Sequence, residues 1–445
     1  MRGWKIRGFA AVLAAASVSA VGFATPGAAS AACTGANIEG NGASVEANAH
    51  KEAWEPTFNK KCAESKTEQV TYLSTSSNKG LESWGVLHLA EKFKGFGVAN
   101  AFVAADDPPN AAQEAEILEE ENPVSGAKVL TIPVLQYAVA IAVHLPEGCT
   151  AEGGKKGAVK RLILSDATLQ GIFAHTITKW EQVPGVVGAS CNKSAPIVRV
   201  VRKEGAGATS TFEKFLFEIN KEPVVGSETW NQLAEHVENI TWPDEGENLL
   251  RAEKGSGMAS LIAKTAGTIG YVNLSELRQN AAFTPTGGGG AGTSIFWAEL
   301  DSKGTKYQDP STNGEENTAA DANCANESYI TLNASGKAGK FPPPSTESEW
   351  NEVTASTTQK ASYPLCGFAY VLSLTDFANF SEEKFPTSAA EVETVQNYLG
   401  FTVSTEGQTL LDEKHDFLEL PNSEAKKGAD NVDKIAQQGV AKIAY

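Results

Sequence analysis

The chain has 445 residues, a formal net charge of −17, 41% apolar residues and 8% aromatic residues. An acidic chain is repelled by nucleic acid and by anionic membrane surfaces, so we expect no nucleic-acid partner, and any bound anion must be held by local donors. The apolar content is enough for packed cores and argues against global disorder, and the length favours two domains.

The N-terminus has the pattern of an export signal. A basic start precedes an apolar, alanine-rich run over residues 8–24, and Ala29-Ser30-Ala31 fits the small-x-small cleavage pattern. We therefore expect residues 1–31 to be a signal peptide and the mature protein to be exported, to the periplasm or to the extracellular side of the cell surface. The alternative is a membrane anchor, but the run is shorter than the roughly 20 residues that a spanning helix needs.

The six cysteines agree with export, because their number is even and none forms a Cys-x-x-Cys pair. In an oxidising compartment this indicates three disulfides, although several connectivities are open. Sequential pairing is favoured because each pair then closes a modest loop: Cys33–Cys62, Cys149–Cys191 and Cys324–Cys366. A rival interpretation is lipid anchoring at Cys33, which follows the small residues of the export signal but would leave Cys62 unpaired.

Short apolar strands alternate with segments of helical periodicity, which favours an α/β fold. The first part of the chain predicts a helix over 43–60, a strand over 68–73, a helix over 78–89, a strand over 99–105 and strands over 129–143 that Pro133 interrupts. The second part predicts a helix that Ser165 or Asp166 caps, a strand over 196–201, a helix after residue 209, a helix over 255–266, strands over 268–272 and 368–374, and helices over 389–399 and 429–443. Residues 284–345, rich in Gly, Ser, Thr and Asn, are expected to be loops with poor packing.

The segment after Arg202 has the pattern of an anion site. A strand ends there, a glycine turn follows, and a helix then begins, so backbone N–H groups converge at the positive end of a helix. Arg202 could add a bidentate fork. Ser44, Ser77 and Asp106 also lie where strands end or helices start, although each alone is typical of a cap or a turn.

Taken in chain order, these segments resemble the phosphate-binding proteins of bacterial phosphate-specific ABC transporters, which have the type II periplasmic-binding-protein fold. The resemblance extends over most of the chain, apart from residues 276–350. It is carried by GNGAS (40–44), YLSTSSNKG (72–80), FVAADDP (102–108), LSDATLQGIFAHTITKW (164–180), RKEGAGAT (202–209), GTIGYV (267–272), YPLCGFAYVL (363–372), STEGQTLL (404–411) and LELP (418–421).

The resemblance implies a set of ligand residues. By position these are the side chains of Ser44, Ser77, Asp106 and Arg202 and the helix-start residues Ala206, Gly207, Ala208 and Thr209. In such sites a carboxylate accepts a hydrogen bond from a protonated phosphate oxygen, which rejects fully ionised sulfate.

The chain departs from the family pattern at the helix start and beside Asp106, where Val103 and Ala105 replace Gly and Ser. Hydroxyl side chains of the family fall here on Ala206 and Ala208, and each lost donor costs roughly 1.5–3 kcal/mol unless Thr209, Ser210 or water substitutes. The departure implies a lower affinity or a different ligand.

The resemblance also implies the domain organisation: two α/β lobes joined by a hinge, with the ligand in the interlobe cleft. The first lobe takes residues 32–138 and 363–445, and the second takes 139–362, including the loop-rich insertion 276–350.

The function that follows is capture of inorganic phosphate for an ABC uptake transporter, with the membrane permease as partner. We expect a monomer without a cofactor or a metal. The alternatives are a binder of sulfate, molybdate or a phosphonate, an adhesion or matrix protein on the same fold, and a secreted phosphatase. An enzyme is disfavoured because the six histidines are scattered and no His-Glu-x-x-His or Gly-x-Ser-x-Gly motif occurs.

Overall fold

The structure is a computed structural model in which the expected signal peptide, residues 1–31, lies outside the described part of the chain. The described residues are 33–63, 66–88, 100–118, 126–152, 161–236, 239–246, 248–283, 294–301, 307–311, 324, 329–331, 341–344, 350–351, 353–355, 362–378, 385–386, 388–411, 416–422 and 431–445.

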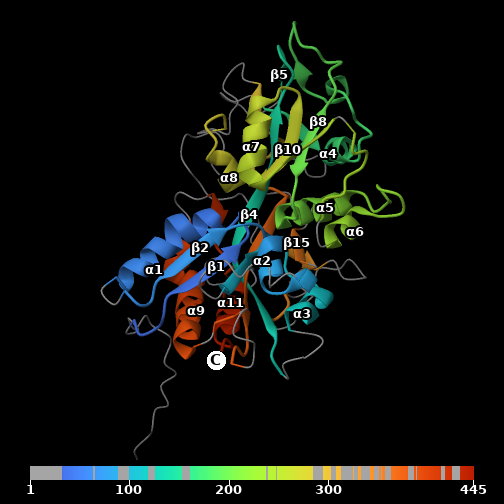
Figure 1. The fold of residues 1–445 in the computed structure, drawn as a ribbon. Helices are drawn as coiled ribbons and strands as arrows, with labels where there is room; N and C mark the ends of the chain where they lie inside the picture. The colour runs from blue at the N-terminus through green and yellow to red at the C-terminus, as the bar shows by residue number, and fades with distance from the viewer. Residues whose placement is uncertain are drawn as a thin grey trace, which may run out of the picture.

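A single long strand, β4 (Val129–His144), connects the two halves of the fold. Up to Ala138 it pairs antiparallel with β16 (Cys366–Leu374), and from Val139 it pairs antiparallel with β10 (Thr268–Asn273). The strands of the sheet follow the order β2 (Val70–Ser74), β1 (Ile38–Gly42), β3 (Asn100–Ala105), β16, β4, β10, β8 (Val198–Arg202) and β9 (Leu249–Ala252). Figure 1 shows β4 passing from the lower group of elements, around β1 and α9, into the upper group, around β10 and α7.

The strand β4 is continuous, so the expectation of separate strands over 129–143 is wrong. The register shifts where Ala369 faces Leu135 and Tyr370 faces Pro133, which leaves Val134 as an extra residue in β4. Proline has no N–H to give to a ladder, and a β-bulge is a place where a sheet accommodates it. The Val134 carbonyl accepts a hydrogen bond from Gln408 Nε2 at 2.8 Å instead.

The first half of the fold places parallel strands beside β16. The strand β1 lies between β2 and β3 and is parallel to both. Its elements are β1 (Ile38–Gly42), a π-helical turn (Ala49–Trp54), α1 (Glu55–Lys61), β2 (Val70–Ser74), α2 (Ser77–Ser83), a 3₁₀ turn (Val86–His88), β3 (Asn100–Ala105), α3 (Ala111–Ile117), α9 (Ala389–Thr402), α10 (Thr405–Thr409), β17 (Phe417–Leu418) and α11 (Val432–Val440).

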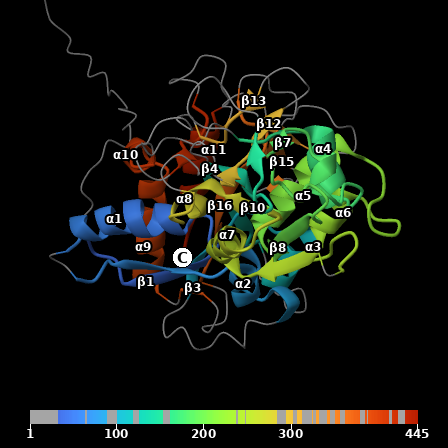
Figure 2. The same ribbon diagram turned by 90° about the horizontal axis from the view of Figure 1, so that it is seen from above.

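The second half places the parallel strands β8, β9 and β10 beside the end of β4. Its elements are β5 (Thr150–Ala151), β6 (Ile163–Ser165), α4 (Asp166–Phe173), a 3₁₀ turn (Trp180–Gln182), β7 (Val186–Val187), β8 (Val198–Arg202), α5 (Gly207–Ile219), α6 (Trp230–Glu235), β9 (Leu249–Ala252), α7 (Lys254–Lys264) and α8 (Leu274–Arg278). Figure 2 shows α1 and α9 on one side of the molecule and α4, α5 and α6 on the other. Ser165 caps α4 by accepting from the Thr168 amide, as the sequence predicts.

The region expected to be a loosely packed insertion contributes to the core in part. Its strands are β11 (Ile295–Trp297), which pairs with β4, β12 (Glu299–Asp301), which pairs with β6, β13 (Tyr307–Gln308), and the pair β14 (Tyr329–Thr331) and β15 (Val353–Ala355). Phe296 and Trp297 are fully buried, and the guanidinium groups of Arg161 and Arg278 lie 4.9 and 5.0 Å from the Trp297 ring. Poor packing is therefore wrong for β11, whose short aromatic run is surrounded by residues of loop-like composition.

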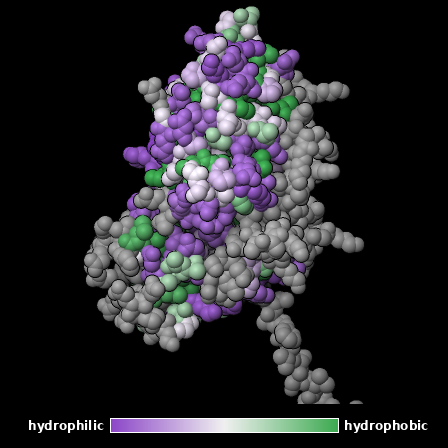
Figure 3. Space-filling view, turned by 90° about the vertical axis from the view of Figure 1, so that its right-hand side faces the viewer, coloured by the Kyte–Doolittle hydropathy of each residue, from purple (hydrophilic) through white to green (hydrophobic). Residues whose placement is uncertain are grey.

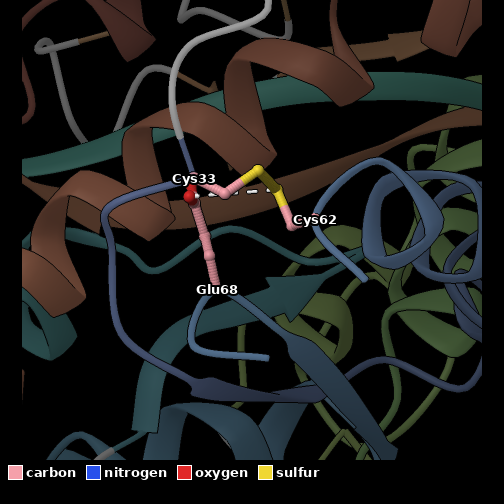
Figure 4. Close-up of side chains that lie close together, drawn as sticks. All are labelled: Cys33, Cys62 and Glu68. Atoms are coloured by element: carbon pink, nitrogen blue, oxygen red, sulfur yellow. Dashed lines mark hydrogen bonds between the residues drawn. A yellow bond between two sulfur atoms is a disulfide. The ribbon is translucent and has the colours of Figure 1, made fainter. Parts of the chain in front are cut away.

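Three disulfides join Cys33–Cys62, Cys149–Cys191 and Cys324–Cys366, which are the pairs that the sequence analysis favours. The first bond uses the sulfur of Cys33 that a lipid anchor would need, so this bond and lipid anchoring at Cys33 exclude each other. Figure 4 shows the Cys33–Cys62 bond beside Glu68. Glu68 Oε1 accepts a hydrogen bond from Asn397 Nδ2 at 2.8 Å, which ties this corner to α9.

The search for a membrane-spanning helix, confined to the described residues, found none of sufficient length and apolar character. On the face in Figure 3, hydrophilic residues predominate among the coloured atoms, and hydrophobic ones are scattered between them.

The Cys149–Cys191 disulfide is expected to contribute measurably to stability. It closes a loop with a sequence separation of 42, so a Cys149→Ala, Cys191→Ala double variant should lose about 4 kcal/mol of unfolding free energy through the freer unfolded chain. Urea denaturation followed by tryptophan fluorescence measures this loss. A midpoint equal to that of the wild type would contradict it, and wild type in reductant, with all three bridges open, should be less stable than the double variant.

Candidate functional site

Three of the expected ligand side chains lie at one edge of the first half of the fold. Ser44 follows β1, Asp106 follows β3, and Ser77 is the first residue of α2 after β2. Because β1, β2 and β3 are parallel, their carboxyl ends meet at the same edge of the sheet, which is where ligands bind in open α/β sheets. All three residues are buried.

Ser77 and Asp106 are paired with each other. The Ser77 hydroxyl donates to Asp106 Oδ1, and the Asp106 amide donates to Ser77 Oγ at 3.2 Å. Burial raises the pKa of Asp106, and the hydrogen bond from Ser77 and the charge of Arg202 offset only part of that rise. The Ser77 hydroxyl, which was expected to donate to a ligand, therefore donates to the Asp106 carboxyl group, whose pKa is raised.

Arg202 enters the site from the second half, at the end of β8, and is 2% exposed. Its Nε donates to Glu204 Oε1 at 3.0 Å, and the same oxygen accepts from the Lys254 amide at 2.8 Å. Burial lowers the pKa of Arg202, but Glu204 and Glu276 together raise it above its ordinary value. The guanidinium group is thus charged, and Glu204 restrains its orientation.

The start of α5 approaches Asp106 closely. A Cβ on Gly207 would lie 2.2 Å from Asp106 Oδ1 and 2.3 Å from the Asp106 carbonyl carbon, so only glycine permits this approach. Ala206 is the N-cap residue and offers no side-chain cap. The Asn239 side chain holds Ala206 by two hydrogen bonds. Its Oδ1 accepts from the Ala206 amide at 3.0 Å, and its Nδ2 donates to the Ala206 carbonyl at 2.9 Å. Gly207 and Ala208 begin the helix, so their amides precede its first i→i−4 hydrogen bond.

The hydroxyl groups that could replace the two lost donors have other partners. The Thr209 hydroxyl lies 2.7 Å from the Tyr271 hydroxyl, which also accepts from the Arg202 amide at 3.3 Å. Ser210 donates to Asp107 Oδ1 at 2.9 Å. In this arrangement neither substitutes for the hydroxyl groups missing at Ala206 and Ala208.

The structure also places a residue at the site that the sequence analysis missed. Glu276, on α8, is 6% exposed, and its carboxyl group interacts with the Ser44 hydroxyl and the Ser256 amide. Burial raises the pKa of Glu276, Arg202 lowers it, and Asp106 raises it further. The sequence has one signal that could have indicated Glu276. This residue stands three positions after β10, the strand of the GTIGYV segment, and it is the first residue of the region without a family counterpart.

A second missed pair joins the two halves beside the site. Lys214 Nζ, on α5, lies 3.3 Å from Asp107 Oδ1 and donates to the Asn351 carbonyl at 2.6 Å. Burial raises the pKa of Asp107, and Lys214 offsets part of that rise. A cavity of about 10 Å³ lined by Asp106, Thr211 and Lys214 has room for about one water molecule, so this part of the junction is closed.

The structure therefore brings Ser44, Ser77, Asp106, Arg202 and Gly207 to one junction between the halves. Chemically, the junction offers one held guanidinium group, amides at a helix start, and carboxyl groups with raised pKa, among them Asp106 and Glu276. Within the described ranges, the one group with metal-like spacing is Cys33, Cys62 and Glu68, and its two sulfurs are bonded to each other, so they offer no thiolate (Figure 4).

Comparisons with known proteins give the family and the fold. The sequence model of a family described as a PBP superfamily domain matches residues 27–406. A phosphate-binding protein from Stenotrophomonas maltophilia has a similar structure, with a TM-score of 0.59 and 17% identity, covering 90% of this chain and 93% of that chain. A human phosphate-binding apolipoprotein gives a TM-score of 0.55 and 19% identity, covering 87% of this chain and 92% of that chain.

A curated relative matches a shorter part of the chain. The phosphate-binding protein PstS of Xylella fastidiosa is 27% identical over 123 residues, which are 27% of this chain and 30% of that protein's length. The chain thus matches less than a third of the length of this relative. Together with the family match, these likenesses confirm the expected α/β fold of type II periplasmic binding proteins.

The approach of α5 to Asp106 yields a stability prediction. Gly207→Ala should lower the unfolding free energy by about 1–3 kcal/mol, because its methyl group overlaps Asp106. The matched control is Gly257→Ala in α7, where the nearest contact of the new Cβ is Ala252 Cβ at 3.7 Å and helix propensity favours alanine by about 0.5–1 kcal/mol. Thermal and urea unfolding compare the two variants. Equal stability of both would contradict the tight approach.

Proposed function

Because the chain belongs to the PBP superfamily, we propose that it is an exported solute-binding protein that captures inorganic phosphate for an ABC uptake transporter. The similar proteins support phosphate as the ligand class, since each of them is named as a phosphate-binding protein. The membrane permease of the transporter is the proposed partner, and the binding protein acts as a monomer without a cofactor.

The observation that carries the proposal is the meeting of Arg202 and Asp106 across the junction. Arg202 supplies a positive charge that Glu204 holds in place, and the first amides of α5 point to the same junction. Asp106 is an acceptor beside them, which suits an oxyanion that still carries a proton. Such a set binds a small anion through local donors in a chain whose net charge is −17.

We further propose that the halves move as lobes about a hinge at β4 and β16. The proposed first lobe takes 32–138 and 363–445, and the second takes 139–362. The register of β4 supports this division, because its partner changes from β16 to β10 between Ala138 and Val139. Closure would bury the ligand, and the permease would recognise the closed form.

Polar contacts are among those that join the proposed lobes, and such contacts suit repeated opening. Lys254 Nζ donates to the Ser74 carbonyl at 3.0 Å, and Asn273 Nδ2 donates to the Val45 carbonyl at 3.3 Å. Polar groups can exchange such bonds for water when an interface opens, whereas a large apolar face could not.

The alternatives make different predictions in one screen. A ligand that binds only the folded protein raises its melting temperature, so phosphate, sulfate, arsenate, molybdate and a phosphonate are compared in a thermal-shift assay. Phosphate and arsenate should give the largest shifts. A larger shift with sulfate or molybdate would favour another oxyanion, turnover of a phosphate ester would favour a secreted phosphatase, and neither binding nor turnover would favour an adhesion protein.

Removal of either charged side chain should weaken phosphate binding. We expect Arg202→Ala and Asp106→Ala each to raise the Kd by more than roughly tenfold, the loss typical of one charge-assisted hydrogen bond. Isothermal titration calorimetry measures the effect. The control is Lys203→Ala, whose side chain is 62% exposed and pairs with the exposed Glu253. Unchanged affinity in both site variants would remove the proposed site.

Selectivity against sulfate should depend on the charge of Asp106. In Asp106→Asn the amide can donate to an aprotic dianion, so the ratio of sulfate to phosphate affinity should rise at neutral pH. Competition titration with both anions gives that ratio, with Glu253→Gln as an exposed control. A ratio equal to that of the wild type would show that Asp106 does not select the ligand.

A further inference from the structure

Glu276 is a buried carboxyl group at the junction that the proposed phosphate site does not yet use. Its side chain lies between the Ser44 hydroxyl and the Ser256 amide, one from each half of the fold. Its Oε2 atom, among the described residues, has no hydrogen-bond partner. A buried carboxyl oxygen without a partner is costly, so this atom is suited to contact a ligand.

The start of α7 holds Glu276 at this place. A Cβ on Gly255 would lie 2.2 Å from Glu276 Oε2, so the carboxyl group rests directly on the backbone of the first helical turn. The helix has 11 residues and no side-chain cap, and its positive end stabilises a nearby negative charge. The adjacent Lys254 amide binds Glu204, which in turn holds Arg202. Glu276 and Arg202 are therefore fixed by the same helix start.

Carboxyl groups outnumber cations around this point. Glu276 interacts directly with the charges of Arg202 and Asp106. The ionisable groups of the junction are, by element, Arg202 and Glu204 at the end of β8, Asp106 and Asp107 after β3, Lys214 on α5, Glu46 after β1, and Lys254 at the start of α7, whose ammonium group donates to the Ser74 carbonyl. With Glu276 these are five carboxyl groups and three cations. When the carboxyl groups are ionised, a bound dianion adds negative charge to a site that already has an excess of it.

We propose that Glu276 contacts the bound oxyanion and that binding places one extra proton between Glu276 and the ligand oxygen that faces it. The inference rests on the proposed function of the site. A hydrogen phosphate dianion has one O–H group, which donates a hydrogen bond to Asp106. Its remaining oxygens can only accept hydrogen bonds. An ionised Glu276 would repel such an oxygen. Either Glu276 is protonated and donates, or the ligand is dihydrogen phosphate and donates its second proton to Glu276. In both forms the complex contains one additional proton, which comes from the buffer and is held by an O–H bond either on Glu276 or on the ligand; no other bond forms or breaks.

The sign of the pH dependence follows directly. Since the complex holds one more proton than ionised Glu276 and the free dianion, phosphate affinity falls as pH rises above the pKa of free Glu276. Burial has already raised that pKa, which moves the fall toward neutral pH. In Glu276→Gln the side-chain amide donates at every pH, so the variant needs no extra proton.

The test is phosphate titration by calorimetry from pH 5.5 to 8.5 with wild type, Glu276→Gln and the control Glu181→Gln, whose carboxyl group is 48% exposed. Wild type and the control should lose affinity more steeply than Glu276→Gln, which should bind at least about tenfold more tightly than wild type at pH 8.5. The titration of phosphate itself affects all three proteins equally and cancels in this comparison.

A second measurement needs no variant at the site. Titrations of wild type at pH 8.5 in two buffers of different ionisation enthalpy give the protons taken up on binding, where free phosphate is almost entirely the dianion. Uptake approaching one proton supports the inference, and no uptake overturns it, as does an equal pH slope in wild type and Glu276→Gln. If wild type binds no phosphate at any pH, the proposed function itself fails. If wild type binds phosphate only at acidic pH, and Glu276→Gln also binds it at pH 8.5, the result supports both the proposed function and the role of Glu276.

Discussion

The close approach of Asp106 to the first residue of α5 is the constraint on which the site depends. Asp106 belongs to the half built on β1, β2 and β3, and α5 belongs to the half built on β8, β9 and β10. Only the hydrogen of Gly207 fits between them. Any side chain there would hold the halves apart and would separate the carboxyl group from Arg202 and the helix amides. A glycine that looks like part of a flexible turn thus decides how closely the two halves of the fold approach each other.

The electrostatics of the site rely on a chain of restraints rather than on an excess of positive charge. The Lys254 amide holds Glu204, and Glu204 holds the guanidinium group of Arg202. Burying these charges is costly, so the arrangement is better explained by fixed orientation than by stability. The raised pKa of Asp106 and Glu276 has the same origin, because both carboxyl groups lose water when the halves meet. The proposed coupling of proton uptake to anion binding follows from this shared loss of water.

Local patterns in the sequence predicted the parts of the structure that depend on near neighbours. Strand ends, the cap at Ser165 and the glycine turn before α5 all follow from residues a few positions apart. The prediction that Asp106 and Arg202 belong to one site came from a different source, the family resemblance carried by the order of the motifs. What failed depends on contacts through space. Glu276 gains its place from the start of α7, some twenty residues earlier, and no periodicity reports that contact.

Two other misses have the same cause. Pro133 indicated a strand break, but the bulge at Val134 absorbs it because Gln408, far away in the chain, binds the freed carbonyl. Trp297 stood in a glycine-rich and serine-rich region, yet it is buried because two arginines from other elements, Arg161 and Arg278, flank its ring. Composition describes a segment on its own and cannot report the partners that cover it.

The continuity of β4 has a consequence for how the molecule comes apart. The first part of β4 pairs with β16 and its second part pairs with β10. The sheet of each half is therefore completed by a strand that both halves share. When either half unfolds, β4 loses hydrogen bonds that the other half also depends on. The unfolding of the two halves is therefore coupled. The protein should accordingly melt as one cooperative body, even though the proposed ligand site lies where the two halves meet.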